Sequence, residues 1–370
     1  MSYKLKILVL ATDYSEPNGR VALAYIHSRN KEYLREGIDV DVLSFAAETD
    51  YIYENIPVYS LESYKRKLIS NDYDILVSHA PNLRNHLRFI KKYGYRFRKV
   101  VFFFHGHEVL RTAEIYPKPY PYIKQNLWKH ALRCVYDEIK IKILKRFFRR
   151  IKEKSYFVFV SQWMANKFHE TVGITPDEIR GKSHIIYNCV GRLFQDGCYD
   201  RSASKKYDFI TIRNNLDGSK YCIDIVCRIA ESNPRFKFCV VGKGDFFRYY
   251  DKPKNLEWID DNLSHDEIVD YLNKAYCALL PTRADAQGVM ACEVATFGIP
   301  LITSNIEICQ EIFQGFDNVG FINNDEETID ISQLYSRFLE LKNTKKNDKF
   351  LLHNTVGKEI SLFRELKEYD

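Results

Sequence analysis

The sequence predicts an α/β protein built from two doubly wound domains, each with a parallel sheet between layers of helices. Short apolar runs alternate with helix-like segments in the first half of the chain, and the same pattern restarts in the second half. The chain has 370 residues, which is too long for one ordinary domain. Its 45% hydrophobic content can fill two cores, and its 28% charged content is typical of a globular chain.

The charge distribution also divides the chain in two. Residues 1–190 hold 32 Lys and Arg against 20 Asp and Glu, whereas residues 191–370 hold 23 against 29. Two halves of opposite sign indicate two domains with different partners. A basic first half favours an anionic lipid surface, a nucleic acid or an anionic substrate.

The first half alternates predicted strands with predicted helices. A helix is expected over Val21–Glu36, with Gly37 as its C-terminal cap. The expected strands are Lys6–Ala11, Ile38–Leu43, Asp74–Ser78, Lys99–Phe104 and Tyr156–Val160. Strands separated by helices favour parallel pairing through crossover connections.

The second half repeats this pattern after a linker-like segment, Asn188–Lys206. The expected strands are Asp208–Ile212, Phe236–Val241, Leu256–Ile259, Ala278–Leu280 and Pro300–Thr303, followed by helices over Leu334–Leu341 and Leu351–Tyr369. We expect domains over 1–190, rejoined by the C-terminal helix at about 352–370, and over 191–351. Ligands of such sheets bind beyond the carboxyl ends of the strands, so loops after strands are the first candidates for a site.

The strongest local signal is the segment Leu280–Pro300. A buried strand ends at Pro281, a loop with Asp285 and Gly288 follows, and a helix carrying Glu293 then runs to Gly298. Backbone N–H groups near Gly288 would form an anion site at the helix N-terminus. The alternative is that Asp285 merely caps the helix and that Glu293 is a solvated side chain.

Two further loops after predicted strands carry candidate residues. Arg213 and Lys220 follow the first strand of the second half, and a diphosphate suits a planar guanidinium beside a point charge. His105, with His107 as the alternative, follows Phe102–Phe104. The alternative for Arg213 and Lys220 is that they are two surface cations in a turn. The alternative for the two histidines is that they are ordinary loop residues or a chance metal-binding pair.

These motifs together resemble family 4 glycosyltransferases of the GT-B fold. Asp285, seven residues and then Glu293 resemble the family's E-x7-E signature, and the segment 242–245 resembles its glycine loop. The resemblance is strong over residues 205–325 and weaker before residue 100. The first acid is Asp285 where the family usually has Glu, and Asn18-Gly19 stands where the family has two glycines. The gap between Arg213 and Lys220 is two residues longer than is usual in the family, and Tyr221 stands where glycine is common.

The resemblance implies a retaining transfer of a sugar from a nucleotide-diphosphate sugar of UDP or GDP type, with no metal and no other cofactor. Arg213 and Lys220 would hold the diphosphate, Asp285 would orient sugar hydroxyls, and His105 would lie beside the anomeric carbon. Glu293 would bind the ribose. The remaining donor contacts would be Gly19, Gly242, Gly244, Trp258, Ile259, Gln287, Gly288 and Val289.

The expected acceptor is a glycan or a lipid-linked glycan, in bacterial surface polysaccharide or glycoconjugate assembly. One rival is a non-catalytic GT-B protein that serves as a scaffold or stabilising partner of another glycosyltransferase. Another is a different enzyme on the same fold, such as an epimerase or a glycan phosphorylase. The Gly242–Gly244 loop could be only a tight turn, and Trp258 only a core aromatic.

The basic surface of the first half suggests where the protein works. Seven cations and no acid lie over Arg84–Lys99, and eight cations with interleaved apolar residues lie over Tyr136–Ser155. The second segment is typical of a basic amphipathic helix at an anionic membrane surface, although a solvated face over a core stripe explains it too. No nucleic-acid module is evident. With nine cysteines, no CxxC pair and no secretory signal, we expect a cytoplasmic chain, peripheral on the inner face of the membrane.

Overall fold

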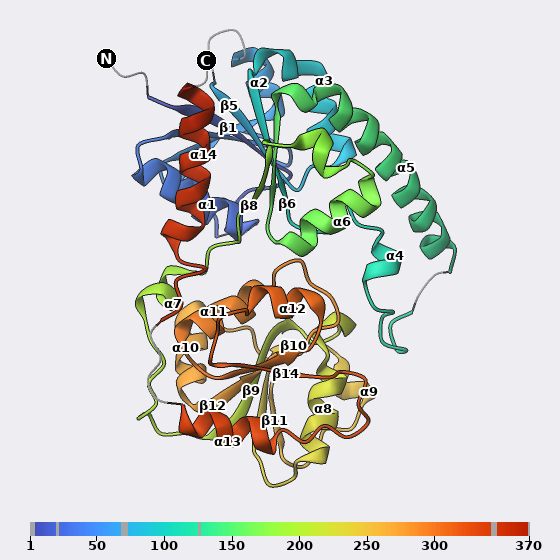
Figure 1. The fold of residues 1–370 in the computed structure, drawn as a ribbon, viewed down its shortest axis with the longest axis vertical. Helices are drawn as coiled ribbons and strands as arrows, with labels where there is room; N and C mark the ends of the chain where they lie inside the picture. The colour runs from blue at the N-terminus through green and yellow to red at the C-terminus, as the bar shows by residue number, and fades with distance from the viewer. Residues whose placement is uncertain (1–3, 20–21, 68–72, 125–126, 342–345, 369–370) are drawn as a thin grey trace. The chain divides into compact units, whose positions relative to one another are not determined.

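The computed structural model describes residues 4–19, 22–67, 73–124, 127–341 and 346–368. The chain divides into two compact units (Figure 1). The first comprises Met1–Arg111, Val135–Asn188 and Leu352–Asp370, and the second comprises Thr112–Cys134 and Cys189–Leu351. Among the described residues, no helix is both long enough and apolar enough to cross a bilayer.

The first unit is built on one eight-stranded sheet. Its strands are β1 (Lys6–Ala11), β2 (Asp39–Ser44), β3 (Tyr51–Tyr53), β4 (Ile56–Ser60), β5 (Ile75–His79), β6 (Lys99–Phe104), β7 (Ser155–Phe159) and β8 (Ser183–Ile185). They are ordered β3-β4-β2-β1-β5-β6-β7-β8, and only β3 runs antiparallel to its neighbour. The strand order reverses at β1, between β2 and β5, which is the geometry of a doubly wound sheet.

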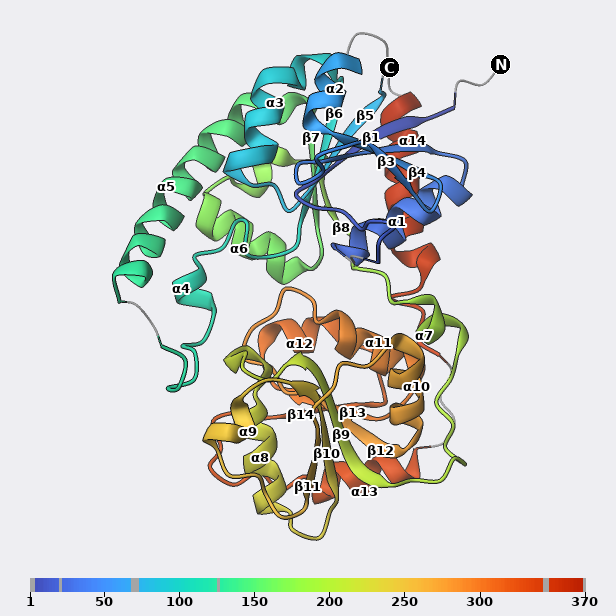
Figure 2. The same cartoon turned by 180° about the vertical axis from the view of Figure 1, so that it is seen from behind.

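Helices cover this first sheet (Figure 2). They are α1 (Ala24–Arg35), α2 (Leu61–Lys67), α3 (Arg88–Tyr93), α6 (Gln162–Val172), α14 (Val356–Glu368) and most of α5 (Leu127–Ile151), with short turns η1 (Leu83–Leu87), η2 (Gly94–Arg96), η3 (Lys152–Lys154), η4 (Pro176–Ile179) and η6 (Leu352–Asn354). The last helix, α14, lies beside α1 in both views. A buried ion pair between Arg29 and Glu359, 3.0 Å, joins these two helices.

The second unit is built on a six-stranded parallel sheet. Its strands are β9 (Tyr207–Asn215), β10 (Phe238–Lys243), β11 (Leu256–Ile259), β12 (Ala275–Leu279), β13 (Leu301–Ser304) and β14 (Val319–Ile322). They are ordered β11-β10-β9-β12-β13-β14, which is the order of dinucleotide-binding sheets. The order reverses between β9 and β12, so the loops after these two strands open onto the position where such sheets bind their ligands.

Helices cover both faces of the second sheet. The helices assigned to the second unit are α4 (Thr112–Ile115), α7 (Arg192–Asp196), α8 (Ile223–Ser232), α9 (Phe246–Tyr249), α10 (His265–Asn273), α11 (Val289–Phe297), α12 (Glu307–Ile312) and α13 (Ser332–Glu340), with the turn η5 (Ser219–Tyr221). Helices α8 and α13 share one buried cluster with Phe209 and Phe238 of the sheet. Right-handed crossovers put α10 and α11, which follow β11 and β12, on the opposite face.

The predicted fold class, two parallel-sheet α/β units of the doubly wound kind, is confirmed. Strands β1, β6 and β11 have the predicted bounds. The ends of the other predicted strands differ from the observed ends by one to three residues. The sequence missed β3, β4, β8 and β14. β3 and β8 have only three residues each, and Gly320 interrupts the apolar run of β14, so the apolar patterns of these strands are too short to detect. Val21 and Tyr369, which are ends of two predicted helices, lie outside the described residues.

Helix α5 corrects the membrane-facing surface that the sequence suggested. The sequence suggested that the apolar residues between the cations of this helix face lipid. Four of them belong to the core instead and are at most 4% exposed: Ile141, Leu144, Phe147 and Phe148. Phe148 packs against Phe102 and Phe104 of β6. These side chains are therefore unavailable to a lipid surface. The exposed apolar residues of α5 lie instead in its first half.

Residues 112–134 belong to the second unit, although the sequence placed them in the first domain. The hydroxyl of Tyr120 donates to Asp224 at 2.8 Å, and that of Tyr122 donates to Asp217 at 2.6 Å. The Tyr122 ring also stacks on Tyr249 at 4.4 Å. This segment is therefore held by the loop after β9, which carries Asp217, and by helices α8 and α9, which carry Asp224 and Tyr249.

Candidate active site

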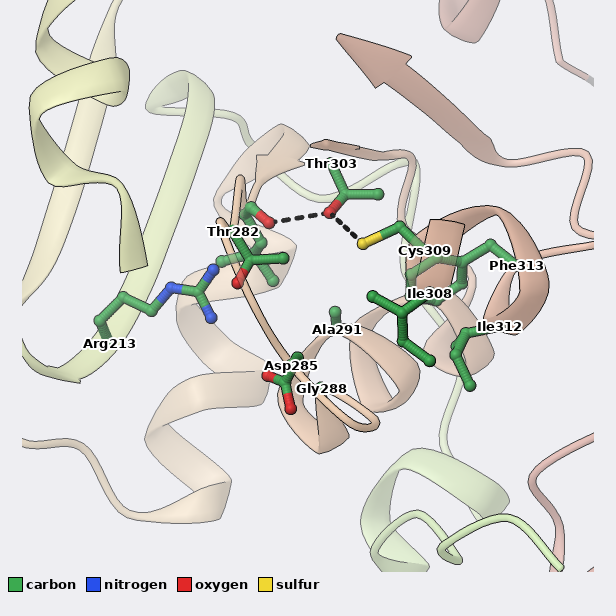
Figure 3. A pocket seen from close by; sticks show the side chains of 11 residues that line it. Arg213, Thr282, Asp285, Gly288, Ala291, Thr303, Ile308, Cys309, Ile312 and Phe313 are labelled. Atoms are coloured by element: carbon green, nitrogen blue, oxygen red, sulfur yellow. Dashed lines mark hydrogen bonds between the residues drawn. The ribbon is translucent and has the colours of Figure 1, made fainter. Parts of the chain in front are cut away.

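Arg213 lies near the carboxyl end of β9, and its guanidinium points toward the loop that carries Thr282 and Asp285 (Figure 3). Its Nη2 donates to the carbonyl oxygen of Pro281 at 2.9 Å. Its Nε is buried and has no hydrogen-bond partner among the described residues. Burial lowers the pKa of this guanidinium, because the charged form loses hydration. A buried cation with an unused donor is an incomplete arrangement that an anion would complete.

Tyr221 brings a second cation close to Arg213. The Arg213 guanidinium carbon lies 5.1 Å from the centre of the Tyr221 ring, and the Lys220 ammonium lies 4.7 Å from it. Among the described residues, neither cation forms an ion pair with a carboxylate. Two positive charges against one ring repel each other, so a dianionic group between them would be strongly favoured.

The turn η5, which carries Lys220, is held from the neighbouring loop by Arg283. The backbone N–H of Arg283 donates to the Lys220 carbonyl at 3.0 Å, and its Nη1 donates to the Ser219 carbonyl at 2.7 Å. The guanidinium also pairs with both oxygens of Asp224. Burial opposes ionisation of Asp224, but the hydrogen bonds from Arg283 and Tyr120 outweigh it and lower the Asp224 pKa. A rigid network thus supports the turn.

The loop between β12 and α11 folds around Asp285. Its Oδ1 accepts the backbone N–H of Ala286 at 2.8 Å and that of Gln287 at 3.3 Å. A side chain on Gly288 would bring its Cβ to 3.3 Å from Asp285 Oδ2, so glycine leaves that carboxylate room. Gln287 is buried, and Val289 is the first residue of α11. Asp285 therefore supports the loop and still lines the pocket with Arg213.

Helix α11 carries Glu293 into the interior instead of into solvent. Glu293 is 7% exposed, and its Oε1 accepts the backbone N–H of Gly191 at 3.1 Å. Burial raises the pKa of this carboxyl to about 7, with the Gly191 hydrogen bond acting in the other direction. The helix ends at Gly298, whose φ of +99° is the left-handed cap that the sequence predicted. The solvated alternative for Glu293 is wrong.

The glycine loop after β10 packs directly on the strand end that carries Arg213. A Cβ on Gly242 would lie 1.9 Å from the Arg213 carbonyl oxygen, so no other residue fits there. Gly244 has a φ of +154° and lies against the Asp217 carboxylate. Trp258 of β11 donates its indole N–H to the Gly242 carbonyl at 3.0 Å, and Ile259 follows it as the last residue of the strand. Trp258 thus secures the loop and is not merely a core aromatic.

His105 lies in the first unit, at the end of β6. Its Nε2 is 3.1 Å from Nδ1 of His79, and its ring packs against Tyr25 at 4.7 Å. The Glu108 carboxylate accepts the backbone N–H groups of His105 and Gly106. Burial lowers the pKa of His105 well below its ordinary value, so the ring is neutral at pH 7.

The two other candidates in the first unit are exposed. The His107 side chain is 69% exposed and lies 3.7 Å from Glu108. Gly19 has a φ of +90°, and a Cβ there would meet no atom within 4 Å. Of the two histidines, His105 is therefore the one whose ring is held in place by neighbouring side chains, whereas His107 lies largely in solvent.

The structure brings most predicted site residues to one edge of the second sheet. Arg213, Asp285 and Gly288 line one pocket, and Lys220 joins them through Tyr221. His105 and Gly19 belong to the first unit. Sequence reasoning missed the partners of these residues: Tyr120, Tyr221, Asp224, Arg283 and His79. Arg283 stands inside the loop that the sequence singled out, but nothing in the local pattern linked it to Asp224, 59 residues away.

Comparison with known proteins bears on the fold and the class of protein. Residues 209–340 match the family model of glycosyl transferases group 1. A comparison with curated protein sequences gives no match. Sucrose-phosphate synthase from Thermosynechococcus elongatus is similar in structure, with a TM-score of 0.71 and 11% identity over 99% of this chain and 100% of that chain.

Two further solved structures are similar along almost the whole chain. A glycosyltransferase from Rickettsia africae has a TM-score of 0.67 and 12% identity, over 100% of both chains. An E. coli structure, described as trehalose-6-phosphate bound with UDP-2-fluoro glucose, has a TM-score of 0.54 and 11% identity over 98% of this chain and 95% of that chain. These likenesses show the GT-B fold, and with the family model they support a glycosyltransferase.

Proposed function

We propose that this protein is a retaining glycosyltransferase that moves a sugar from a UDP- or GDP-type nucleotide sugar to a glycan or lipid-linked acceptor. The acceptor would belong to a surface polysaccharide or a glycoconjugate. The proposal goes beyond the fold and the family model in naming the donor class, the acceptor class and the stereochemistry. The proposed reaction needs no bound metal, since the two fixed cations, Arg213 and Lys220, would neutralise the diphosphate.

One observation carries the donor assignment: the Arg213 guanidinium lies beside Lys220 with a buried, unused Nε–H and with no ion pair to a carboxylate among the described residues. A guanidinium left in this state is costly unless an anion binds it. It stands next to the point where the sheet order reverses, and phosphates bind there in sheets of this order. A diphosphate offers the two negative charges that the two cations require.

The other residues fit a nucleotide sugar held at this edge. Glu293 offers a buried carboxylate to the two ribose hydroxyls, and the glycine loop lets the backbone approach the nucleotide. Asp285 would accept from sugar hydroxyls. Arg213 and Lys220 would stabilise the negative charge that develops on the leaving diphosphate, and His105 would bind the sugar beside its anomeric carbon.

The test compares matched cation variants by calorimetry with UDP and GDP, followed by transfer assays with a panel of nucleotide sugars. Arg213→Ala and Lys220→Ala should each weaken nucleotide binding by about tenfold or more, since each loses a charge-assisted hydrogen bond of about 1.5–3 kcal/mol. Arg235→Ala and Lys206→Ala are the controls, because these cations lie at the opposite edge of the same sheet, near the starts of β10 and β9.

Three outcomes would be informative. If the controls weaken binding as much as the site variants, the effect is only net charge and the proposed site is wrong. If the parent binds a nucleotide sugar but neither transfers nor hydrolyses it with any acceptor, the scaffold alternative is favoured. If the parent binds no nucleotide diphosphate at all, the donor assignment fails.

For the acceptor side, a membrane surface is favoured by the first half of α5. Five side chains recur there at helical spacing and are at least 52% exposed: Trp128, Leu132, Val135, Tyr136 and Ile139. Such a stripe spans about 16 Å of helix. Lys142 and Arg146, both exposed, continue along the same helix, so the stripe adjoins positive charge that complements anionic headgroups.

Vesicle binding tests this attachment, with Trp128 as a built-in reporter. Trp128 is 81% exposed, Trp163 is 8% exposed, and Trp258 is half-buried in β11. A blue shift of emission on vesicles that is lost in Trp128→Phe therefore reports Trp128 entering lipid. We expect the shift with anionic vesicles, little with neutral ones, and release by high salt. Leu132→Ser should weaken binding, while Ile52→Ser, at a 66% exposed position of β3, should not. Equal effects of both variants, or no binding to anionic vesicles, would remove the membrane role.

A further inference from the structure

Two histidines end two neighbouring strands of the first sheet. His79 is the last residue of β5, and His105 directly follows β6, its parallel neighbour. Nδ1 of His79 lies 3.1 Å from Nε2 of His105, and the two rings stack with centroids 5.4 Å apart. The strand register thus brings two side chains together that are 26 residues apart in the sequence.

Both rings are neutral at pH 7. Burial lowers the pKa of each well below its ordinary value, and the positive charge of Arg29 acts in the same direction. Arg29 itself pairs with Glu359 at 3.0 Å, and the Glu108 carboxylate is engaged with backbone N–H groups. In a hydrogen bond between two neutral imidazoles, one nitrogen must donate and the other must accept.

The surroundings of His79 decide which ring donates. His79 is 2% exposed, and its Nε2 is buried without a hydrogen-bond partner among the described residues. If Nδ1 of His79 accepted, its proton would reside on Nε2 as a buried N–H with no acceptor. If Nδ1 donates, Nε2 carries no proton and is only a hydrogen-bond acceptor without a donor. A buried acceptor without a partner costs less free energy than a buried N–H without one. His105 therefore accepts at Nε2.

We propose that His79 is a positioning residue that holds His105 in its Nδ1–H tautomer, so that His105 presents a hydrogen-bond donor to a substrate oxygen. The proposal rests on the proposed function in assuming that His105 faces the sugar. It adds that the ring binds as a neutral donor and does not act as a base through Nδ1. The substrate atom opposite Nδ1 must then be an acceptor, such as a hydroxyl or phosphate oxygen.

The packing keeps the pair in one arrangement. The Phe103 ring stacks on His79 at 4.4 Å, and the Tyr25 ring lies 4.7 Å from that of His105. Gly106, with a φ of +146°, permits the turn in which Glu108 binds the two backbone N–H groups. These contacts fix the plane of each imidazole ring, and the hydrogen bond between His79 Nδ1 and His105 Nε2 fixes which edges of the two rings face each other.

The test replaces His79 with phenylalanine and with asparagine. His79→Phe keeps a flat ring on Phe103 but removes the donor, whereas His79→Asn retains an N–H near the position of Nδ1. His86→Phe is the matched control, because His86 is fully buried and bonds Ser78 at 2.8 Å instead of His105. The first measurement is the ¹⁵N NMR signature of the His105 ring in each free protein, assigned with His105→Ala.

We expect the Nδ1–H form of His105 in the parent, in His79→Asn and in His86→Phe, and a mixture of tautomers in His79→Phe. In transfer assays, His79→Phe should lower kcat by about tenfold with the donor KM little changed, and His79→Asn should recover most of it. An Nε2–H form in the parent, or an unchanged tautomer in His79→Phe, overturns the proposal.

The NMR result does not depend on finding a substrate. If no nucleotide sugar supports activity, or if His105→Ala retains full activity, the proposed function of His105 fails while the tautomer measurement still decides the role of His79. If the tautomer shifts in His79→Phe without any loss of kcat in an active enzyme, His79 orients the ring but does not serve the reaction, and the positioning role is rejected.

Discussion

Donor binding should depend on pH through Glu293. The carboxyl is buried in α11, and its pKa is raised from 4.5 to about 7. Near pH 7 the free protein is thus a mixture of protonated and ionised forms. Only the ionised form accepts hydrogen bonds at both oxygens, as the two ribose hydroxyls require. We therefore expect the affinity for a nucleotide sugar to rise as the pH rises through 7.

The size of the effect follows from the ionised fraction. With a pKa of about 7, about a tenth of the carboxyls are ionised at pH 6 and about nine-tenths at pH 8, so affinity should rise about tenfold. Glu293→Gln should bind more weakly at pH 8 and lose this dependence. Stability changes in the opposite direction. Since the folded pKa is raised, the carboxyl's favourable contribution is complete below pH 4.5 and is lost as the pH rises to about 7.

Calorimetry with an intact nucleotide sugar between pH 6 and pH 8 is the assay, because a diphosphate diester does not titrate in this range. At pH 8 the melting temperature of Glu293→Gln should equal or exceed that of the parent, since a shift of about 2.5 pKa units corresponds to a burial cost of ~3 kcal/mol. A flat affinity profile in the parent, or an unchanged profile in Glu293→Gln, would refute the reasoning. An unfolded variant would show that Glu293 is structural.

Three other outcomes follow from the site. Gly242→Ala should lower the melting temperature more than Gly298→Ala, because its Cβ would lie 1.9 Å from the Arg213 carbonyl, whereas at Gly298 nothing lies within 4 Å; equal losses in thermal unfolding would contradict this. Asp224→Asn should weaken nucleotide-sugar binding about threefold to tenfold by releasing Arg283 from the turn beside it, measured by calorimetry. Transfer activity should persist in excess chelator, and activity restored only by manganese or magnesium would reject the metal-free reaction.

The fold class could be predicted because most strands are buried on both faces. Lys99–Phe104 is apolar at five of six positions, and the structure has a strand with those bounds. The missed strands lack this signal. β3 and β8 have three residues each and are largely half-exposed, so they form because a neighbouring strand offers hydrogen bonds and not because of their own pattern. Helix ends were predictable where glycine adopts a positive φ, as at Gly37 and Gly298.

The candidate site was predictable only residue by residue. A loop after a parallel strand identifies where Arg213 and Asp285 must lie, since the carboxyl ends of parallel strands share one edge. The partners of these residues come from distant segments, and no local pattern reveals them. The same limit applies to α5: its apolar residues recur on more than one side of the helix, and only the packing of β6 decides that Phe148 is buried and Ile139 is exposed.

The turn that carries Lys220 departs from the family pattern but has supports of its own. The loop between Arg213 and Lys220 is longer than the resemblance leads one to expect, and Tyr221 stands where glycine is common. In the structure the Tyr221 ring lies against both cations and so joins them in one cluster. Arg283, bound to Asp224, holds the turn from outside. A longer loop would ordinarily be looser, and these two supports supply the rigidity that fixed charges need if they are to act on a leaving diphosphate.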